Sequence, residues 1–361
     1  MSDTQPIASG PNSNVVVSVD AMGGDKGSGV IIAGLLRAVH KHSNIRFLVH
    51  GPEDILKPLI DKHDLEEFCT IVHAERTVSM DDKPSQVMRH GKGTSMWSAV
   101  TSVKQQEADA CVSCGNTGAL MAISMVRLRK LAGINRPAIA ILWPSFGPNG
   151  SNVMLDVGAD VRADENDLLQ FALMGASYSR NGFAVKRPRV GLLNVGTEEH
   201  KGRAELKAAH DLIKESAETG QFEFLGFVEG GDIPSDRVDV IVTDGFTGNV
   251  ALKTAEGTAS FIGTALRQSF KHNLLSKLSA ILAYGPLSRL KRTTDPRRVN
   301  GGVFLGLNGT VVKSHGAADA TGVAAAIGLA YRLGSAKFST KLAARVASVN
   351  GFAEDHEEDG N

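Results

Sequence analysis

The chain alternates short apolar runs with longer amphipathic stretches for most of its length. Several runs are apolar at consecutive positions, which is typical of central strands buried on both faces of a sheet. We expect strands at Val15–Asp20, Ile45–His50, Cys69–His73, Ala110–Ser113, Ala138–Leu142, Val153–Val157, Val190–Val195, Glu223–Val228 and Val238–Thr243. Helix-length segments between them include Ser28–His42, Thr117–Leu131, Glu165–Arg180 and Arg203–Thr219.

This alternation predicts an α/β fold with a doubly wound, mainly parallel sheet. We expect one α/β domain over residues 15–345, although the loop Phe146–Ser151 is also consistent with a boundary between two lobes. Residues 1–14 have no such pattern and are expected to be disordered. Residues 346–361 form a C-terminal segment with five carboxylates between Glu354 and Asp359, a charge run that stays solvated.

Composition narrows the class of protein. The 361 residues are 42% hydrophobic, and 39 Lys and Arg balance 39 Asp and Glu, which is typical of a soluble globular chain and argues against general affinity for nucleic acid. No apolar run reaches the roughly 18 residues of a membrane span, and the start of the chain lacks the hydrophobic region of a signal peptide. Three cysteines suit a reducing compartment. We therefore expect a cytoplasmic protein.

The 39 glycines concentrate directly after the predicted strands. The loops concerned are Asp20–Asp25, Cys114–Ala119, Asp156–Ala159, Asn194–Glu198 and Asp244–Asn249. Parallel strands end at one edge of the sheet, where doubly wound proteins bind ligands. Helices that begin at Thr117 and Gly248 would point unpaired amides at that edge, which favours an anion such as phosphate. Each loop alone is also consistent with an ordinary capped turn, but five together favour a shared polar site.

These loops, in this order, closely resemble the motifs of the bacterial PlsX family, the phosphate acyltransferases of phospholipid synthesis. The matching segments are Asp20-Ala-Met-Gly-Gly-Asp25, Gly115-Asn-Thr-Gly-Ala119, Asp156-Val-Gly-Ala159, Asn194-Val-Gly-Thr-Glu198 with Lys201-Gly202, and Thr243-Asp-Gly-Phe-Thr-Gly-Asn249. The resemblance extends from about Val15 to Leu333. It departs at Lys26-Gly27-Ser28, where the family often has His-Ala-Pro, and at Cys114, where alanine is common.

The resemblance implies transfer of a long-chain acyl group from acyl carrier protein to inorganic phosphate. It also implies a homodimer at the membrane periphery, a downstream glycerol-3-phosphate acyltransferase that uses the acyl phosphate, and a fold similar to phosphate acetyltransferases and isopropylmalate dehydrogenases. Neither a dinucleotide fingerprint nor a P-loop occurs in the chain, so a dehydrogenase is the weakest alternative. A phosphate acetyltransferase-like enzyme that uses acyl-CoA and a non-catalytic membrane-surface scaffold remain open.

Attack of phosphate on a thioester needs a cradle for the dianion and donors for the oxyanion, and it needs neither a metal nor a redox cofactor. We expect Lys201 and Asn249 to be catalytic, as the cation and as an oxyanion donor; the alternatives are a solvated loop lysine and a helix N-cap. The expected substrate-binding residues are Asp20, Gly23, Gly24, Asp25, Gly115, Asn116, Thr117, Gly118, Asp156, Asn194, Gly196, Thr197, Glu198, Asp244, Thr247, Gly248 and His315. The carboxylates among them are expected to orient donors or to balance Lys and Arg, and His315 is either an acid–base group or structural. The pair Cys111-x-x-Cys114 lacks further ligands for zinc.

Residues 257–294 contain no acidic residue. Apolar side chains recur there at spacings of three and four, between Arg267, Lys271, Lys277, Arg289, Lys291 and Arg292. This pattern predicts a basic amphipathic helix, broken near Gly285–Pro286, that suits an anionic membrane surface. A dimer-packing helix and a docking face for the acidic carrier protein are the alternatives.

Overall fold

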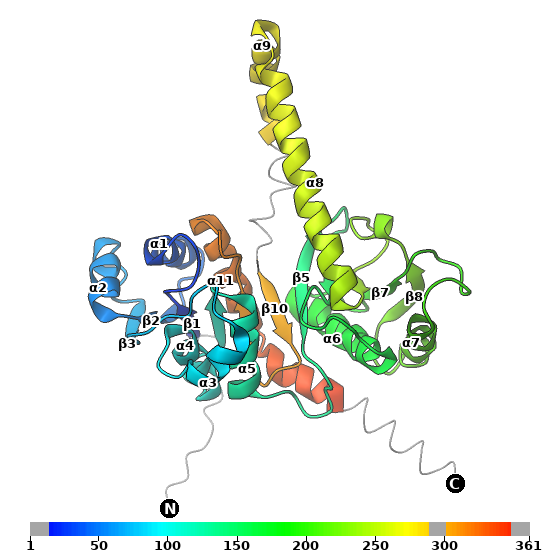
Figure 1. Cartoon of the computed structure of the whole chain (residues 1–361), viewed down its shortest axis with the longest axis horizontal. Coiled ribbons are helices and arrows are strands. Elements are labelled where there is room, and N and C mark those ends of the chain that lie inside the picture. The colour runs from blue at the N-terminus through cyan, green and yellow to red at the C-terminus, as the bar shows by residue number, and fades with distance from the viewer. Residues whose placement is uncertain (1–13, 289–300, 348–361) are drawn as a thin grey trace, which may run out of the picture. The chain divides into compact units, whose positions relative to one another are not determined.

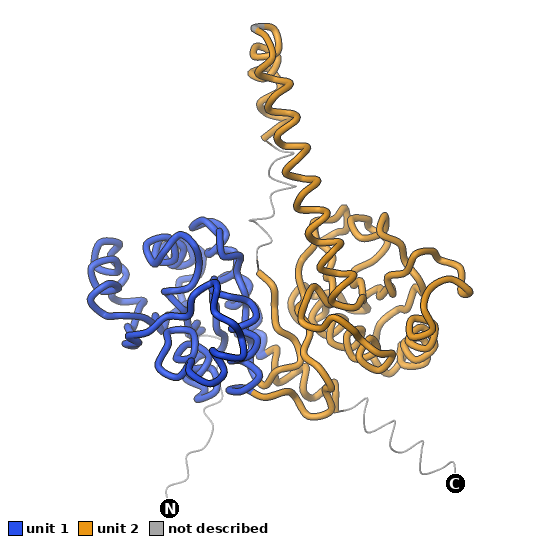
Figure 2. Tube along the Cα trace, viewed as in Figure 1, with its two compact units in different colours: residues 1–128, 309–337 blue, residues 129–308, 338–361 orange. Residues whose placement is uncertain are grey.

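The structure is a computed structural model that describes residues 14–288 and 301–347. The predictions for residues 1–13, 289–294 and 348–361 lie outside the described residues. The chain divides into two compact units, Met1–Leu128 with Gly309–Lys337 and Arg129–Asn308 with Phe338–Asn361 (Figure 2). Each unit contains a mostly parallel sheet, so the predicted α/β class is confirmed.

In the part of unit 1 that the structure describes, five parallel strands have the order β3-β2-β1-β4-β11. The strands are β1 (Val15–Asp20), β2 (Ile45–Gly51), β3 (Cys69–His73), β4 (Ala110–Ser113) and β11 (Thr310–Lys313). The helices are α1 (Ser28–Val39), α2 (Glu53–Lys62), α3 (Pro84–His90), α4 (Ser95–Lys104), α5 (Thr117–Leu128) and α11 (Ala320–Ser335) (Figure 1).

Helices cover both faces of the unit 1 sheet. Along β1, Val15 faces Gly334 of α11, whereas the hydroxyl of Ser18 donates to the Ala99 carbonyl oxygen of α4 at 2.7 Å. Because successive side chains of a strand point to opposite faces, α11 and α4 lie on opposite sides. This burial on both faces explains the continuous apolar run that predicted the strand.

Three neighbouring strands of unit 1 end level with one another. Asp20, the last residue of β1, pairs in register with Ser113 at the end of β4, and Ser113 pairs with Lys313 at the end of β11. The loops that follow these strands therefore leave the sheet at one edge.

The described residues of unit 2 contain six strands in the order β10-β5-β6-β9-β7-β8. They are β5 (Ala138–Pro144), β6 (Ser151–Leu155), β7 (Arg189–Leu193), β8 (Glu223–Val228), β9 (Val240–Val242) and β10 (Gly302–Leu305). Among these described strands, β5 alone runs antiparallel to its neighbours, β10 and β6. The loop Phe146–Ser151 connects β5 to β6 and so lies inside this unit. The adjacent strands β6, β9 and β7 are parallel, and their loops share an edge.

Side chains cap the starts of the helices of unit 2, with the exception of the helix at Ala204–Glu215. The helices are α6 (Glu165–Phe183), α7 (Ala204–Glu215), α8 (Gly245–Lys271) and α9 (Leu274–Leu282), with a short 3₁₀ turn at Gly230–Asp232; residues 284–288 and 338–347 are also helical. Asp164 and Asp167 form a capping box at the start of α6. Tyr178 of α6 packs edge-on against Phe338 with ring centroids 5.7 Å apart.

The helix α8 extends beyond the sheet of unit 2 (Figure 1). Its 27 residues span roughly 40 Å, and its buried residues are Gly245 and Gly248, both in the first turns. The side chain of Asn273 caps α9 by accepting from the Ser276 amide at 2.8 Å. The helix is thus broken at His272–Asn273, earlier than predicted, and again after Leu282, next to the predicted break. No helix in residues 14–288 and 301–347 is long and apolar enough to cross a membrane.

The pattern of apolar and polar residues predicted the positions of most helices and strands. The bounds of β1, β3, β4 and β8 are those predicted. The strand β6 ends at Leu155, two residues before the predicted end, because the Asp156 side chain captures the amides of the following loop. The helix α8 begins at Gly245 and not at Gly248, because Asp244 caps it. Neither β10 nor β11 is among the predicted strands.

Candidate functional site

In unit 1, Asp20 is a buried carboxylate held by two hydroxyls. Ser95 donates to its Oδ1 and Ser113 to its Oδ2, each at 2.7 Å. The Met22 amide also approaches Oδ1 at 3.3 Å. Burial raises the pKa of Asp20, and the hydrogen bonds from Ser113 and Ser95 oppose that shift. Asp20 is 2% exposed, and its hydrogen bonds hold Ser95 and Ser113 in place.

The loop after β1 packs backbone to backbone on the loop after β4. A Cβ on Gly23 would lie 2.6 Å from the Gly115 amide nitrogen, so only glycine allows this approach. Gly24 has φ 98°, a left-handed conformation. The structure therefore brings together the first two predicted glycine loops.

The start of α5 leaves three backbone amides for a ligand. Asn116 Oδ1 accepts from the Ala119 amide at 3.0 Å, and the Gly115 amide donates to Ser113 Oγ at 3.0 Å. Within the described residues, the amides of Asn116, Thr117 and Gly118 have no acceptor. The predicted cradle over Gly115–Gly118 thus reduces to three donors.

Two predicted residues of unit 1 lie at its surface. The Asp25 side chain is exposed, while its amide donates to the Gly316 carbonyl oxygen at 2.9 Å. His315 is also exposed, and its Nδ1 accepts from the Ala317 amide at 3.2 Å. This bond is consistent with the structural reading of His315.

In unit 2, Asp156 shapes the loop after β6. Its Oδ1 accepts from the Ile139 amide at 2.8 Å, and its Oδ2 accepts from the amides of Ala159 and Asp160 at 2.9 and 2.8 Å. Burial raises the pKa of this carboxyl, and the amide bonds oppose the shift. With its oxygens occupied by amides, Asp156 is suited to positioning the loop.

Asp244 links the loop after β9 to a cation. Its Oδ1 caps α8 by accepting from the Thr247 amide at 2.8 Å, and its Oδ2 accepts from the Thr247 hydroxyl at 3.0 Å and from the Arg203 guanidinium. Asp244 is 3% exposed. The amide of Thr247 is therefore engaged and does not face a ligand.

Asn249 lies inside the second turn of α8, so its alternative reading as a helix N-cap is wrong. Its side chain is exposed and faces the loop after β6: a Cβ on Gly158 would lie 3.7 Å from Asn249 Cγ. Beneath it, a Cβ on Gly248 would overlap the Asp156 carbonyl oxygen. Close backbone contact therefore positions the Asn249 amide group.

The loop after β7 carries Lys201. Asn194 closes this loop, because its Oδ1 accepts from the Val195 amide at 2.8 Å and its Nδ2 donates to the Lys201 carbonyl oxygen at 3.2 Å. Lys201 Nζ lies 2.8 Å from Glu198 Oε1. That bond raises the pKa of Lys201 and lowers the pKa of Glu198.

The other two predicted residues of this loop differ in exposure. Thr197 is exposed, whereas Gly196 is buried against the Lys201 side chain. The ion pair of Lys201 and Glu198 is itself half-exposed, so it is weak enough for an incoming anion to compete with Glu198.

The predicted site residues thus form two groups. The loops after β1, β4 and β11 are neighbours in unit 1, and those after β6, β9 and β7 are neighbours in unit 2. The shared site of all five loops stays a prediction. The residues that sequence reasoning missed are Ser95, Ser113 and Arg203. Ser113 was recognisable as the last strand residue before a predicted loop, whereas Ser95 had no local signal.

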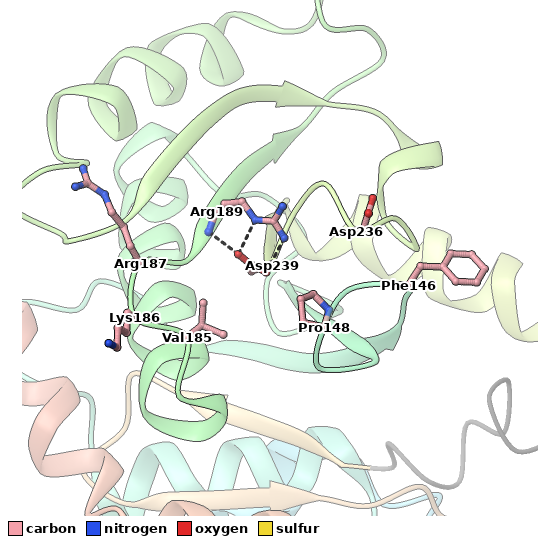
Figure 3. A pocket seen from close by; sticks show the side chains of 8 residues that line it. All are labelled: Phe146, Pro148, Val185, Lys186, Arg187, Arg189, Asp236 and Asp239. Carbon is pink, nitrogen blue, oxygen red and sulfur yellow. Dashed lines mark hydrogen bonds and ion pairs between the residues drawn. The ribbon is translucent and has the colours of Figure 1, made fainter.

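A cavity of about 610 Å³ lies elsewhere in unit 2 (Figure 3). It is lined by Phe146, Pro148, Val185, Lys186, Arg187, Arg189, Asp236 and Asp239. Arg189 is the first residue of β7, so the cavity borders the opposite end of that strand from the Lys201 loop. Both oxygens of Asp239 engage the Arg189 guanidinium at 3.0 Å. Because Asp239 already neutralises the Arg189 guanidinium, we assign the candidate functional site to the loops that follow the strands and not to this cavity.

Comparison with known proteins identifies the family. A family profile described as "Fatty acid synthesis protein" matches residues 15–341. A "Phosphate acyltransferase" of Cereibacter sphaeroides is 64% identical over 99% of this chain and 97% of its own length. The chain belongs to the PlsX family of phosphate acyltransferases. Another "Phosphate acyltransferase", from Paracoccus denitrificans, is 65% identical over 96% of this chain and 94% of its own. As a member of the PlsX family, the protein is an acyltransferase of lipid synthesis that acts on phosphate.

Solved structures confirm the fold of this PlsX-family chain. A phosphotransacetylase from Streptococcus pyogenes superposes with a TM-score of 0.59 at 14% identity and covers 89% of this chain and 94% of its own. The EutD phosphotransacetylase from Staphylococcus aureus gives 0.56 at 14% identity over 91% and 96%. These likenesses show a common α/β architecture.

Proposed function

We propose that the chain transfers a long-chain acyl group from acyl carrier protein to inorganic phosphate and releases acyl phosphate. The observation that supports this proposal is the set of amide and cationic groups at the carboxyl ends of the parallel strands, in a chain whose family acts on phosphate. Within unit 2, Lys201 and Arg203 provide two cations in the loop after β7, each held by a carboxylate: Glu198 of the same loop holds Lys201, and Asp244 at the start of α8 holds Arg203.

The reaction joins a phosphate oxygen to the thioester carbon and breaks the carbon–sulfur bond. The carrier thiolate leaves and takes up the proton that the phosphate loses. Lys201 exchanges Glu198 for the phosphate dianion, and the Asn249 side-chain amide donates to the oxyanion of the tetrahedral intermediate. A donor of this kind contributes roughly 3 kcal/mol to stabilisation of the transition state.

The buried carboxylates have positioning roles in this scheme. Asp20, Asp156 and Asp244 each accept several hydrogen bonds from their own unit. Carboxylates so engaged keep phosphate donors in place and do not need to take a proton. The leaving thiolate needs little assistance, so no general base is assigned.

The arm formed by α8 and α9 supports the proposals of peripheral membrane binding and of a homodimer. Phe261 and Leu278 are 74% and 55% exposed, and Lys271 and Lys277 lie on the same acid-free stretch. A basic amphipathic helix binds an anionic lipid surface, and exposed apolar side chains also suit a second copy of the chain. Acyl phosphate is lipophilic and hydrolysable, so release at the membrane suits delivery to a glycerol-3-phosphate acyltransferase.

Incubation of the purified chain with palmitoyl carrier protein and labelled phosphate tests the reaction. We expect labelled acyl phosphate, formed more slowly by the Lys201→Ala variant. A parallel reaction with palmitoyl-CoA distinguishes the donor: turnover with CoA alone would assign a phosphate acetyltransferase-like activity. Absence of product from both donors would contradict the proposal and favour the scaffold.

A further inference from the structure

The start of α8 presents two large apolar side chains to solvent. Phe246 is 62% exposed and Val250 is 51% exposed, and residues four apart lie on the same face of a helix. Asn249 is three residues after Phe246 and borders that face. The opposite side of these turns is packed, because Gly245 and Gly248 are buried. An apolar surface thus begins beside the side chain that is proposed to hold the reacting carbonyl.

A third exposed apolar side chain lies in the loop after β6. Val161 is 70% exposed. It follows Asp160, whose amide donates to Asp156 Oδ2 at 2.8 Å and whose carbonyl oxygen lies so close to Gly245 that a Cβ there would overlap it. Val161 and Phe246 therefore each follow one member of a tight backbone contact. Val161 thus adds an apolar side chain next to the start of α8.

The polar groups of the proposed reaction lie at the same edge of unit 2. Arg203 donates to Asp244, the N-cap of α8, and Lys201 lies two residues before Arg203 in the loop after β7. Asn249 faces the loop after β6, since a Cβ on Gly158 would lie 3.7 Å from the Asn249 Cγ. The exposed apolar side chains therefore border the groups assigned to phosphate and to the oxyanion.

A neutral hydrocarbon chain is the ligand that suits this surface. Residues 245–252 carry no charge, so the first two turns of α8 offer nothing to a phosphate or to a charged headgroup. Exposed apolar side chains that gather beside polar groups are typical of ligand surfaces, and each methylene that they remove from water strengthens binding. An acyl chain whose carbonyl lies beside Asn249 leaves the reacting centre where Phe246 and Val250 are exposed.

We propose that Phe246, Val250 and Val161 form the contact surface for the first part of the acyl chain, and that Phe246 makes the enzyme selective for long chains. This proposal deepens the proposed function and rests on it, since it places the acyl group beside Lys201 and Asn249. Phe246 is a specificity-determining residue in this scheme. It contacts the chain and takes no part in making or breaking bonds.

The test compares Phe246→Ser with Phe146→Ser in the full chain, without lipid or detergent. Phe146 is 85% exposed and lies in the loop that precedes β6, at the opposite edge of the sheet from the loop of Val161 (Figure 3). We expect Phe246→Ser to lower kcat/KM at least tenfold with palmitoyl carrier protein and less than threefold with butyryl carrier protein. Phe246→Leu should restore most of the turnover of the palmitoyl donor. Phe146→Ser should behave as the wild type, and all three variants should keep the wild-type melting temperature.

A binding measurement gives a second readout that needs no turnover. The probe is a methylene phosphonate analogue of palmitoyl phosphate, kept below its micelle concentration and titrated by calorimetry. Phe246→Ser should raise the Kd of the analogue at least tenfold, and Phe146→Ser should leave it unchanged.

Three results would each overturn the inference: equal Kd values for the wild type and Phe246→Ser, equal losses of kcat/KM with the two donors, or a lower sedimentation coefficient of Phe246→Ser. The last result would assign this surface to contact with a second copy of the chain. A wild-type chain that binds the analogue but forms no acyl phosphate would instead contradict the proposed function.

Discussion

The hydroxyl of Ser95 lies 2.7 Å from Oδ1 of Asp20 and donates a hydrogen bond to that buried carboxylate. Asp20 ends β1, and Ser95 begins α4, 75 residues later in the chain. Hydrogen bonds to an ionised acceptor are roughly twice as strong as those between neutral groups. The bond therefore fixes the loop after β1 relative to a helix that the sequence places far away.

Replacing Ser95 by alanine should destabilise unit 1. Asp20 would lose one of its two hydroxyl donors, and we expect the free energy of unfolding to fall by about 2 kcal/mol, measured by urea denaturation. Ser335→Ala removes an exposed hydroxyl that bonds to the Tyr331 carbonyl oxygen, and it should change stability by less than about 0.5 kcal/mol. An equal fall in the free energy of unfolding in the two variants would show that the hydrogen bond to Asp20 stabilises the chain no more than an exposed one does.

Lys201 and Asn249 are expected to act in the reaction and not in folding. Because both side chains are partly or fully exposed, Lys201→Ala and Asn249→Ala should keep the wild-type melting temperature. Each should lower kcat/KM for phosphate-dependent acyl transfer by about 10²- to 10³-fold. Lys207→Ala, at an exposed position of α7, serves as the control. Near-normal acyl phosphate formation by both variants would refute the assignment.

His50 is a buried histidine that joins β2 to its neighbours. Its Nε2 lies 3.0 Å from Ser18 Oγ and its Nδ1 lies 2.9 Å from Ser98 Oγ. The Ser18 hydroxyl donates to the Ala99 carbonyl oxygen, so it accepts from His50 Nε2. Nδ1 is then left as an acceptor for Ser98. These two hydrogen bonds of His50 therefore require a neutral imidazole ring, with its proton on Nε2.

Acid should weaken this network. Burial lowers the pKa of His50 to about 4 in the folded chain, against about 6.5 when unfolded. The unfolded chain therefore binds the proton more tightly. The contribution of His50 to stability is complete above pH 6.5 and is lost as the pH falls to about 4, by about 3 kcal/mol.

A comparison with His50→Gln isolates this effect. The glutamine variant should be less stable than the wild type at pH 7, and that deficit should shrink by about 3 kcal/mol between pH 7 and pH 4. Urea denaturation at several pH values measures it. His200→Gln, at an exposed loop position, controls for the loss of an imidazole outside the network. A deficit independent of pH would contradict the neutral buried ring.

The arm is expected to bind anionic vesicles. Leu278→Glu with Lys277→Glu places two carboxylates on α9, and we expect co-sedimentation with anionic vesicles to fall at least tenfold, because both apolar burial and charge attraction are lost. Ile55→Glu with Lys62→Glu makes the same kind of change at exposed positions of α2 and should leave binding intact. Unchanged co-sedimentation of the α9 variant would refute membrane binding through the arm. Analytical ultracentrifugation of the same variant tests the dimer.

The hydrophobic pattern of the sequence predicted the ends of two elements, α8 and β6, incorrectly. A helix was predicted from Gly248, but Asp244 captures the Thr247 amide and starts α8 three residues earlier. Asp156 similarly ends β6 early. In both cases an Asp side chain accepts hydrogen bonds from amides three or four residues later and so sets the end of the element.

The sequence by itself determined the α/β class, the positions of most strands and the glycine loops that follow them, because burial on both faces of a sheet and tight turns leave patterns within a few residues. Only the tertiary structure decided that Ser95 and Ser113 hold Asp20, that Arg203 is paired with Asp244, and that Lys313 is buried beside the loops. It also divided the five predicted loops between two compact units. These relationships depend on the order of strands in the sheets, which brings together residues tens to hundreds of positions apart and leaves no periodic signal in the chain.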